Sequence, residues 1–390
     1  MSQLTQIHYD KPVSHTSQQS VWRIPANSKV FSNSMKILDI NPVTNQEAYF
    51  PLLLGVHALV KSVEVKLNSK SVDLWNSKLL LPYMLAQRAD SERQFGVMRE
   101  LYKTGNNLSY DNQSNLFSFT KDLVNDGSST INLTLFSDLL AKIGIIDDTV
   151  ELIVNWETNL SKVFIPSGTT YTLDAPYLSY ETVDMDLKQP QVVYFRQYLT
   201  DQFSIPALTA VADQSSTKRT ELLSNAFNSK FVSKVMFVNQ PNSVASDAPS
   251  VDLSDLYTQF GQYMSTPMIK ESFNINVNGR SVFTSNSNTN DATKLSMCCD
   301  SWNNACLLSS AHFNTKAGIV DTISNVGKLN GFASFGGCEL NQRINKQLQI
   351  SYQRSSDLSG VATTAYNQPM VLSCIGEVMT SLQKGVKVDL

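Results

Sequence analysis

The sequence predicts an all-β protein with short inserted helices, built from two similar β-sandwich units in tandem. Short stretches of alternating apolar and polar residues recur along the chain and are bounded by Asn, Ser, Pro and Gly, as is typical of sandwich strands. Several of these stretches occur twice, in the same order, about half a chain apart. The length of 390 residues also suits two domains that each bury a core.

The clearest repeat is an alternating stretch that runs into a turn. Residues 63–72 read VEVKLNSKSV, and residues 273–282 read FNINVNGRSV. Both stretches alternate, reach a turn that begins with Asn, and continue with a basic residue and Ser-Val. Aligning Leu67 with Val277 superposes the two turns, and Asn-Gly is a hairpin dipeptide. We therefore expect equivalent hairpins in the two units.

Two further pairs of segments follow in the same order. Residues 150–156 read VELIVNW and have a counterpart in residues 348–352, with Trp156 aligned to Tyr352. The first of these is the cleanest predicted strand, since every second residue from Val150 to Trp156 is apolar and shares one face. The triplet Leu-Ser-Tyr at 178–180 matches Leu-Ser-Cys at 372–374. Three ordered matches favour a duplication.

These patterns define the expected domain organisation. Residues 1–20 are polar and without periodicity, and we expect a flexible N-terminal arm there. Each unit is expected to form a jelly roll of roughly eight strands in two packed sheets. The expected boundaries are 21–187 for the first jelly roll, 188–229 for a linker that carries Pro190 and Pro206, and 230–390 for the second jelly roll.

Helices and turns are expected between the strands. Residues 77–97 have helical spacing interrupted near Pro82, and residues 137–144 form a short helix that Gly144 closes at its C′ position. Residues 331–337, with Gly336 and Gly337, are expected to be a turn region.

The composition excludes several function classes. Charged residues make up only 17% of the chain and the net charge is −3, which argues against a protein whose main role is to bind nucleic acid. The N-terminus lacks the basic and apolar blocks of a signal peptide, no run reaches the ~20 apolar residues of a membrane span, and the five cysteines are an odd set confined to the second half. We expect synthesis in a reducing, cytosolic compartment.

The cysteines give no metal site that we would predict. Cys298, Cys299 and Cys306 are the only cluster, with His312 nearby, but adjacent residues of a strand point to opposite faces and no Cys-X-X-Cys spacing exists. Buried free thiols are the preferred interpretation, and we predict neither a metal nor a cofactor.

No catalytic constellation emerges from the acids and histidines either. His8 and His15 fall in the predicted arm, and His57 lies in an apolar run. Asp147 and Asp148 are adjacent, whereas Asp184 and Asp186 would share a strand face, which is more typical of a solvated sheet face than of an acid/base pair. The sequence has no Gly-X-Ser-X-Gly elbow and no phosphate-binding Gly-rich loop. We therefore predict a structural or binding protein, and no catalytic residues.

At family level the chain resembles the double jelly-roll capsid proteins of virophages, polinton-like viruses, tailless membrane-containing phages and large eukaryotic DNA viruses. The resemblance is carried by SVWRIP at 20–25, the hairpin at 63–72 and its repeat at 273–282 followed by Lys294 and Leu295, and as a pattern it covers most of residues 20–390. It implies a homotrimer whose six β units form a pseudo-hexagonal block of an icosahedral shell. It also implies contacts with neighbouring capsomers, with minor capsid or penton proteins and with an internal membrane or core, and a location in the virion capsid.

Two other function classes stay open at this point. The first is a minor capsid, penton or receptor- or carbohydrate-binding β-sandwich protein, for which exposed aromatic residues would be needed; the candidates are Tyr102, Tyr110, Tyr171 and Tyr177. The second is a β-sandwich hydrolase that uses Asp184, Asp186 or Glu181.

Overall fold

The structure is a computed structural model of the chain. It describes residues 5–30, 34–46, 48–51, 56, 59–76, 109–111, 116–119, 129–133, 136–142, 144–146, 148–158, 160, 163, 169–183, 192–205, 216–241, 269–282, 287–288, 335–356, 370–383 and 386–389.

The chain divides into two compact units. Unit 1 comprises residues 1–81, 94–197 and 379–390, and unit 2 comprises residues 82–93 and 198–378. The last residues of the chain therefore belong to the first unit. Two long strands, β17 (Val192–Ile205) and β25 (Met370–Gln383), begin in one unit and continue into the other.

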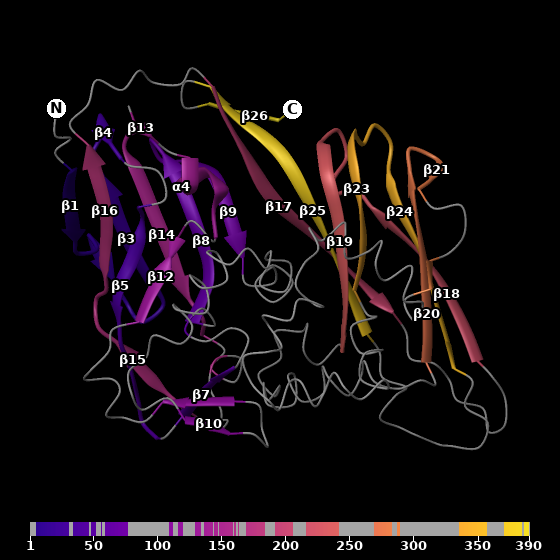
Figure 1. The fold of residues 1–390 in the computed structure, drawn as a ribbon, viewed down its shortest axis with the longest axis horizontal. Coiled ribbons are helices and arrows are strands. Elements are labelled where there is room, and N and C mark those ends of the chain that lie inside the picture. Colours follow the sequence, from indigo (N-terminus) through magenta and orange to yellow (C-terminus); the bar gives the residue numbers. More distant parts are fainter. Residues whose placement is uncertain are drawn as a thin grey trace. The chain divides into compact units, whose positions relative to one another are not determined.

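Unit 1 contains two main antiparallel sheets (Figure 1). The first has the order β1-β16-β5-β12, with strands β1 (Thr5–Asp10), β16 (Tyr177–Val183), β5 (Lys36–Ile40) and β12 (Ser129–Asn132). The second has the order β2-β3-β14-β8-β9, with strands β2 (Ser14–His15), β3 (Gln19–Ile24), β14 (Val150–Trp156), β8 (Val60–Leu67) and β9 (Lys70–Asn76).

Smaller elements complete unit 1. Strands β10 (Ser109–Asp111), β11 (Leu116–Phe119) and β7 (Ala48–Pro51) form a three-stranded sheet. Two short pairs join β13 (Ile145–Ile146) to β4 (Ser28–Lys29) and β15 (Tyr171–Leu173) to β6 (Pro42–Thr44). The helix α4 (Asp138–Lys142) precedes β13, and β26 (Val386–Asp389) pairs with the end of β25.

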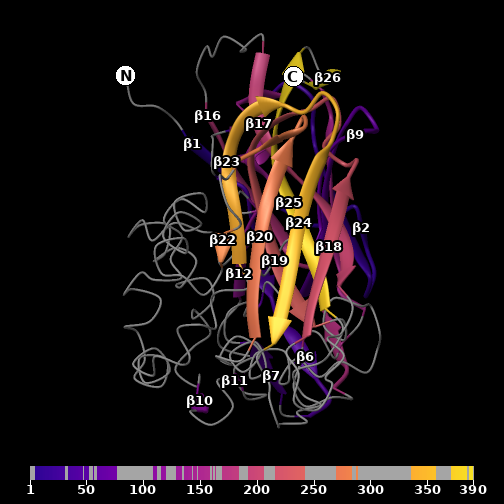
Figure 2. The ribbon, with the colours of Figure 1, turned by 90° about the vertical axis from the view of Figure 1, so that its right-hand side faces the viewer.

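Unit 2 also contains two antiparallel sheets. One has the order β17-β25-β19-β23, with β19 (Phe231–Pro241) and β23 (Phe335–Arg343). The other has the order β18-β24-β20-β21, with β18 (Ser216–Ser224), β24 (Leu348–Ser356), β20 (Ile269–Val277) and β21 (Arg280–Ser281), and β22 (Ser287–Asn288) pairs with β20. Figure 2 looks onto β18, β24 and β20, with β19 and β25 of the other sheet behind them.

The two units share one strand topology. Taken in chain order, β1, β3, β5, β8, β9, β12, β14 and β16 of unit 1 correspond one by one to β17, β18, β19, β20, β21, β23, β24 and β25. This correspondence converts the path β1-β16-β5-β12 into β17-β25-β19-β23, and β3-β14-β8-β9 into β18-β24-β20-β21. Eight strands in two four-stranded paths of this order form a jelly roll. The predicted tandem jelly rolls are confirmed.

The repeated hairpins have the same register in both units. Leu67 pairs with Val150 across β8 and β14, and Val277 pairs with Leu348 across β20 and β24. Val150 therefore corresponds to Leu348. The predicted alignment of Trp156 with Tyr352 is displaced by two residues, which keeps the same strand face and so the same apolar pattern.

Each of these hairpins turns on an asparagine. Asn68 and Ser69 have φ values of 46° and 66°, and Asn278 and Gly279 have φ values of 54° and 84°. Two successive residues with positive φ give the type I′ turn, whose twist matches that of the paired strands. The backbone amides of the two asparagines donate to equivalent positions, Thr149 O at 3.1 Å and Gln347 O at 3.3 Å.

Alternating apolar residues build each core. In unit 1, Val150, Leu152, Val154 and Trp156 of β14 are fully buried. In unit 2 one cluster joins buried residues from both sheets, including Leu222 and Ile350 of one sheet and Leu372 and Cys374 of the other. A core shared by two sheets is the defining feature of a sandwich.

Several local expectations differ from the structure. Residues 5–15 of the expected arm form β1 and β2, which pair with β16 and β3. Residues 188–229 of the expected linker contain β17 and β18, because Pro190 and Pro206 flank β17 without interrupting it. Gly336 and Gly337, expected in a turn, lie in β23 and pair with Phe237 and Met236.

The short helix is confirmed, but its end differs from the expectation. Gly144 follows α4 without adopting the left-handed conformation of a C′ glycine, and its carbonyl accepts a hydrogen bond from Val30 N at 2.8 Å. In the part of the chain that the structure describes, no helix is long and apolar enough to cross a membrane.

Candidate functional site

Many residues weighed from the sequence lie outside the described residues. They are His57, Tyr102, Asp147, Asp184, Asp186, Lys294, Leu295, Cys298, Cys299, Cys306 and His312, together with the predicted helix at 77–97. For Tyr110 and Cys338 the structure describes the backbone only. Among the residues that are described, no three His, Cys, Asp or Glu side chains gather as metal ligands would.

His15 is a structural residue in unit 1. Its Nε2 lies 2.9 Å from the carbonyl oxygen of Leu173, so this nitrogen must carry the proton that is donated. Its Nδ1 then accepts from the hydroxyl of Ser20 at 2.8 Å, and Ser20 Oγ accepts from Trp156 Nε1 at 2.9 Å. This chain of hydrogen bonds satisfies the largest buried side chain of β14 and ties β2 to the sandwich.

His8 has a similar anchoring role on β1. Its ring stacks on the ring of Tyr180, with centroids 4.7 Å apart and planes inclined by 8°. Its Nε2 lies 2.8 Å from Thr182 Oγ1. The Tyr180 hydroxyl donates to Asp10 at 2.9 Å, and burial together with this bond raises the pKa of Tyr180 well above its ordinary value. Both histidines weighed as arm residues therefore hold strands in place.

The remaining candidates also have structural surroundings. Glu181 lies in β16 opposite Ile7, and Asp148 accepts a hydrogen bond from Asn68 Nδ2 at 2.5 Å. Burial, with a smaller effect of Glu157, raises the pKa of Tyr171 to about 12, so its hydroxyl stays protonated. Tyr177 is half-buried beneath Lys11, whose Nζ lies 5.7 Å from the ring centroid. Neither tyrosine presents a fully exposed aromatic face for a sugar.

Large apolar side chains are exposed at the N-terminal edge of unit 1. Ile7 and Tyr9 are 51% and 60% exposed on β1, and Val13 beside β2 is 62% exposed. Strand β1 ends the path β1-β16-β5-β12, so within the described residues one side of its backbone has no strand partner. An edge strand with exposed apolar residues is suited to pairing with another protein surface. We call Ile7, Tyr9 and Val13 the apolar edge.

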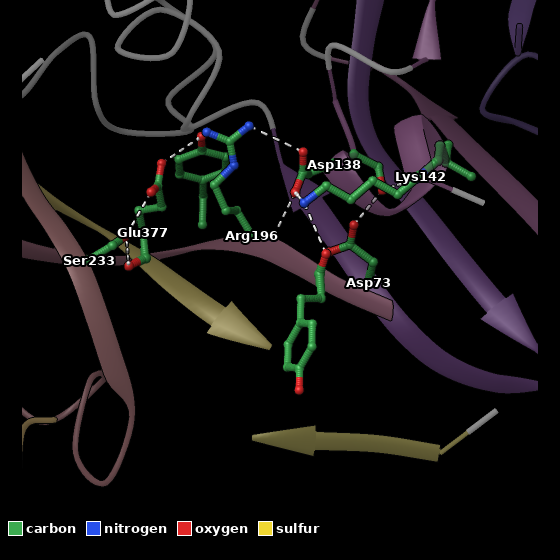
Figure 3. A network of polar contacts seen from close by, with 10 residues as sticks. Asp73, Asp138, Lys142, Arg196, Ser233 and Glu377 are labelled. Atoms are coloured by element: carbon green, nitrogen blue, oxygen red, sulfur yellow. Dashed lines mark hydrogen bonds and ion pairs between the residues drawn. The ribbon is translucent and has the colours of Figure 1, made fainter. Parts of the chain in front are cut away.

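A buried polar cluster lies on the opposite edge strand of the other sheet, at β9 (Figure 3). Asp73 Oδ2 accepts from Ser137 Oγ at 2.5 Å, and its Oδ1 accepts from Gln197 Nε2 at 3.0 Å. Gln197 also donates to Val72 O at 2.8 Å and accepts from Thr380 Oγ1 at 3.2 Å. We call Asp73, Ser137, Gln197 and Thr380 the Asp73 cluster, and all four side chains are buried.

The neighbouring carboxylate, Asp138, has a different environment. It begins helix α4 and contacts Lys142 Nζ at 2.8 Å and Arg196 Nη2 at 3.2 Å, while the Arg196 backbone amide donates to it at 2.9 Å. Burial alone would raise the pKa of Asp138, but the hydrogen bonds from Lys142 and Arg196 outweigh it and the net pKa is lowered. Asp138 therefore forms structural ion pairs, and these fix the start of β17.

Unit 2 has its own buried acid. Glu377 on β25 accepts from Ser233 Oγ at 2.6 Å and from the Tyr198 hydroxyl at 3.1 Å (Figure 3). The Ser233 hydroxyl is also 3.1 Å from the Glu377 carbonyl oxygen. Such bonds satisfy a carboxyl group that would otherwise be costly to bury. No periodic pattern in the sequence predicts these polar contacts, because their members lie far apart along the chain.

Known proteins resemble this chain in structure but do not match it in sequence. No family model matches the sequence, and neither does any curated protein. Solved structures that are similar over nearly the whole chain include three viral examples. A chain of the Sputnik virophage structure has a TM-score of 0.59 and 10% identity, with 99% of this chain and 88% of that chain covered.

The other two structures are viral as well. The PBCV-1 virus capsid has a TM-score of 0.53 and 11% identity, with 100% of this chain and 97% of that chain covered. The mavirus major capsid protein has a TM-score of 0.51 and 8% identity, with 98% of this chain and 90% of that chain covered. The chain has the double jelly-roll fold of viral capsid proteins.

The double jelly-roll fold accounts for the low sequence identity. Its requirements are a period-2 apolar pattern, turn residues at hairpins and sufficient core volume, which many sequences can meet. The histidines and tyrosines described above support the fold. Among the described residues of unit 1, the apolar edge is one surface where large apolar side chains are available for interactions.

Proposed function

We propose that the protein is a viral capsid structural protein that assembles as a homotrimer into pseudo-hexagonal capsomers of an icosahedral shell. The observation that carries this proposal is the presence of two complete jelly rolls with the same strand order in one chain. Three such chains supply six equivalent β units, which suit a hexagonal outline. The similar structures include a virus capsid and a major capsid protein, which supports self-association into a shell.

The composition and the surface of unit 1 also favour assembly. Only 17% of the residues are charged, so an interface made from this surface desolvates few charges. The apolar edge exposes Ile7, Tyr9 and Val13 beside an unpaired strand edge. We propose that a neighbouring copy covers the apolar edge. The protein then acts by assembly and has no catalytic residues, cofactor or metal, and it resides in the virion capsid after synthesis in the host cytosol.

We propose that residues 21–187 and 230–390, expected as the two jelly-roll domains, form most of the two β units in the capsomer, with β1 completing the first and β17 and β18 completing the second. Minor capsid or penton proteins and an internal membrane or core are the further partners that this role implies. A penton or carbohydrate-binding role is the alternative, but the described tyrosines Tyr171 and Tyr177 give it little support, because one has a buried hydroxyl and the other lies against Lys11.

Size-exclusion chromatography with light scattering tests the proposal. The expected species has three times the chain mass of 43.3 kDa, or is a larger shell-like particle. Ile7→Lys should shift the protein toward the monomer, because it places a charge in the proposed interface, and should leave the far-UV circular dichroism spectrum of the folded chain unchanged. Lys61→Ala, at an exposed position of β8, is the matched surface control. A wild-type protein that stays monomeric at micromolar concentration would contradict the homotrimer.

A further inference from the structure

The Asp73 cluster joins four segments that are distant along the chain. Asp73 lies on β9, Ser137 precedes helix α4, Gln197 lies on β17, and Thr380 lies near the C-terminal end of β25. The hydrogen bonds run in sequence from Ser137 to Asp73, then to Gln197 and Thr380. The Asp73 carboxyl group is therefore linked through Gln197 to the C-terminal segment of unit 1.

The donors to this carboxyl group are all neutral. They are the Ser137 hydroxyl, the Gln197 amide and the backbone amide of Leu74. Among the described residues, Lys387 on β26 is the only cation that acts on Asp73, and it does so through space from an exposed position. A buried carboxylate without a paired cation is costly, and taking up a proton removes that cost.

The other charged groups around the cluster are already engaged. Asp138, Lys142 and Arg196, from α4 and β17, form their own ion pairs. On β8, Val65 lies opposite Asp73, and the flanking residues Glu64 and Lys66 pair with each other at 3.7 Å. Within the described part of unit 1, Asp73 thus has only the through-space charge of Lys387 to offset its own, and a proton would remove that buried charge.

We propose that Asp73 makes the stability of unit 1 depend on pH. When its carboxyl group is protonated, the contacts among β9, α4, β17 and the C-terminal segment are more stable. In the protonated form the carboxyl group can donate to Ser137 Oγ, while its other oxygen still accepts from Gln197 Nε2. Both side-chain contacts of the carboxyl group are kept, the one with Ser137 in the reverse direction, and the buried charge is removed. This regulation goes beyond the proposed capsid function and does not depend on it.

The direction of the pH effect follows from this environment. Burial raises the pKa of Asp73, and the hydrogen bonds from Ser137 and Gln197 and the charge of Lys387 oppose the rise only in part. The folded pKa therefore lies above the unfolded pKa. The folded state binds a proton that the unfolded chain releases, so stability increases as the pH falls through the folded pKa. Ordinary carboxylates paired with cations behave in the opposite way.

The test is urea unfolding of the full-length protein at pH 8, 7, 6 and 5. Asp73→Asn mimics the protonated form, since its amide nitrogen can donate to Ser137 and its oxygen can accept from Gln197. We expect the folding constant of Asp73→Asn to exceed that of the wild type at pH 8. The ratio should be constant above the folded pKa, shrink by up to about tenfold per pH unit as the pH falls below it, and level off below the pKa of the unfolded chain. Asp174→Asn, at an exposed carboxylate, should show no such convergence.

Two further readouts locate the effect. Hydrogen exchange at Thr380–Gln383, corrected for the intrinsic pH dependence, should slow between pH 8 and 5 in the wild type and stay constant in Asp73→Asn. Infrared spectra of the wild type with isotope-labelled aspartate should show a protonated carboxyl band that persists above the pH range in which an ordinary aspartate ionises, which decides the matter even if the variant does not fold. A stability ratio independent of pH, or ionisation of every aspartate within the ordinary range, would overturn the proposal.

Discussion

Gly376 gives the sharpest test of how the unit 2 core is packed. A Cβ at this position would lie 2.4 Å from Cε1 and 2.6 Å from Cδ1 of Phe227, whose ring is fully buried. Carbon atoms at rest lie about 3.5–4.0 Å apart, so the ring would have to move by about 1 Å in Gly376→Ala. A close-packed interior resists such movement, and we expect a loss of about 1–3 kcal/mol in the free energy of unfolding.

Urea denaturation of Gly376→Ala, with Gly144→Ala as control, measures this cost. Gly144 has no atom within 4 Å of an added Cβ, so its variant should stay within about 0.5 kcal/mol of the wild type. Phe227→Leu removes the ring atoms that would clash, and the double variant should show a favourable coupling of about 1 kcal/mol or more. An unchanged stability in Gly376→Ala, or additive effects in the double variant, would refute the packing argument.

Three further predictions follow from the described contacts. Asn68→Gly and Asn278→Gly keep the positive φ but remove side-chain hydrogen bonds, that of Asn68 to Asp148 and those of Asn278 to Asn345 and Lys346. Each variant should therefore lower the free energy of unfolding by about 1–2 kcal/mol, and equal stability to the wild type in both would contradict the shared turn. Trp156→Phe leaves Ser20 Oγ without its indole donor and should cost about 1–3 kcal/mol in thermal unfolding, whereas a smaller change would mean that water replaces the bond. Because the pKa of Asp138 is lowered, its stabilisation is present above the pH at which an ordinary aspartate ionises and is lost as the pH falls through the folded pKa. Asp138→Asn should therefore reduce stability at pH 7 and flatten the acid limb of the curve of unfolding free energy against pH, and an unchanged acid limb would contradict this.

The sequence was most informative where one strand face is apolar. Val150–Trp156 has an apolar residue at every second position, and the structure has a strand with those bounds. The repeated hairpins were visible because a type I′ turn restricts its residues to Asn, Gly and a few others. The predicted alignment of β14 with its counterpart β24 was displaced by two residues, because a pattern with a period of two cannot distinguish such a shift.

The missed elements lack that signal. Strand β1 has Ile7 and Tyr9 on its exposed face and packs His8 against Tyr180, so the usual pattern of apolar residues inside is absent. Strand β17 mixes polar and apolar residues on both faces, which obscured it between its flanking prolines.

The buried acids were beyond sequence reasoning for a different reason. The partners of Asp73 come from α4, β17 and β25, and only the folded chain brings them together. The one local signal was Asp73 itself, which shares a strand face with the buried Trp75. A charged residue on an otherwise apolar face marks a position that needs partners, but it does not identify them.

A cryo-EM reconstruction of the purified oligomer tests the central claim most directly. We predict a threefold particle in which each chain supplies two jelly rolls, so that six β units form a pseudo-hexagonal block with the apolar edge of each copy covered. A stable monomer, a dimer, or a trimer in which Ile7, Tyr9 and Val13 remain exposed to solvent would contradict it.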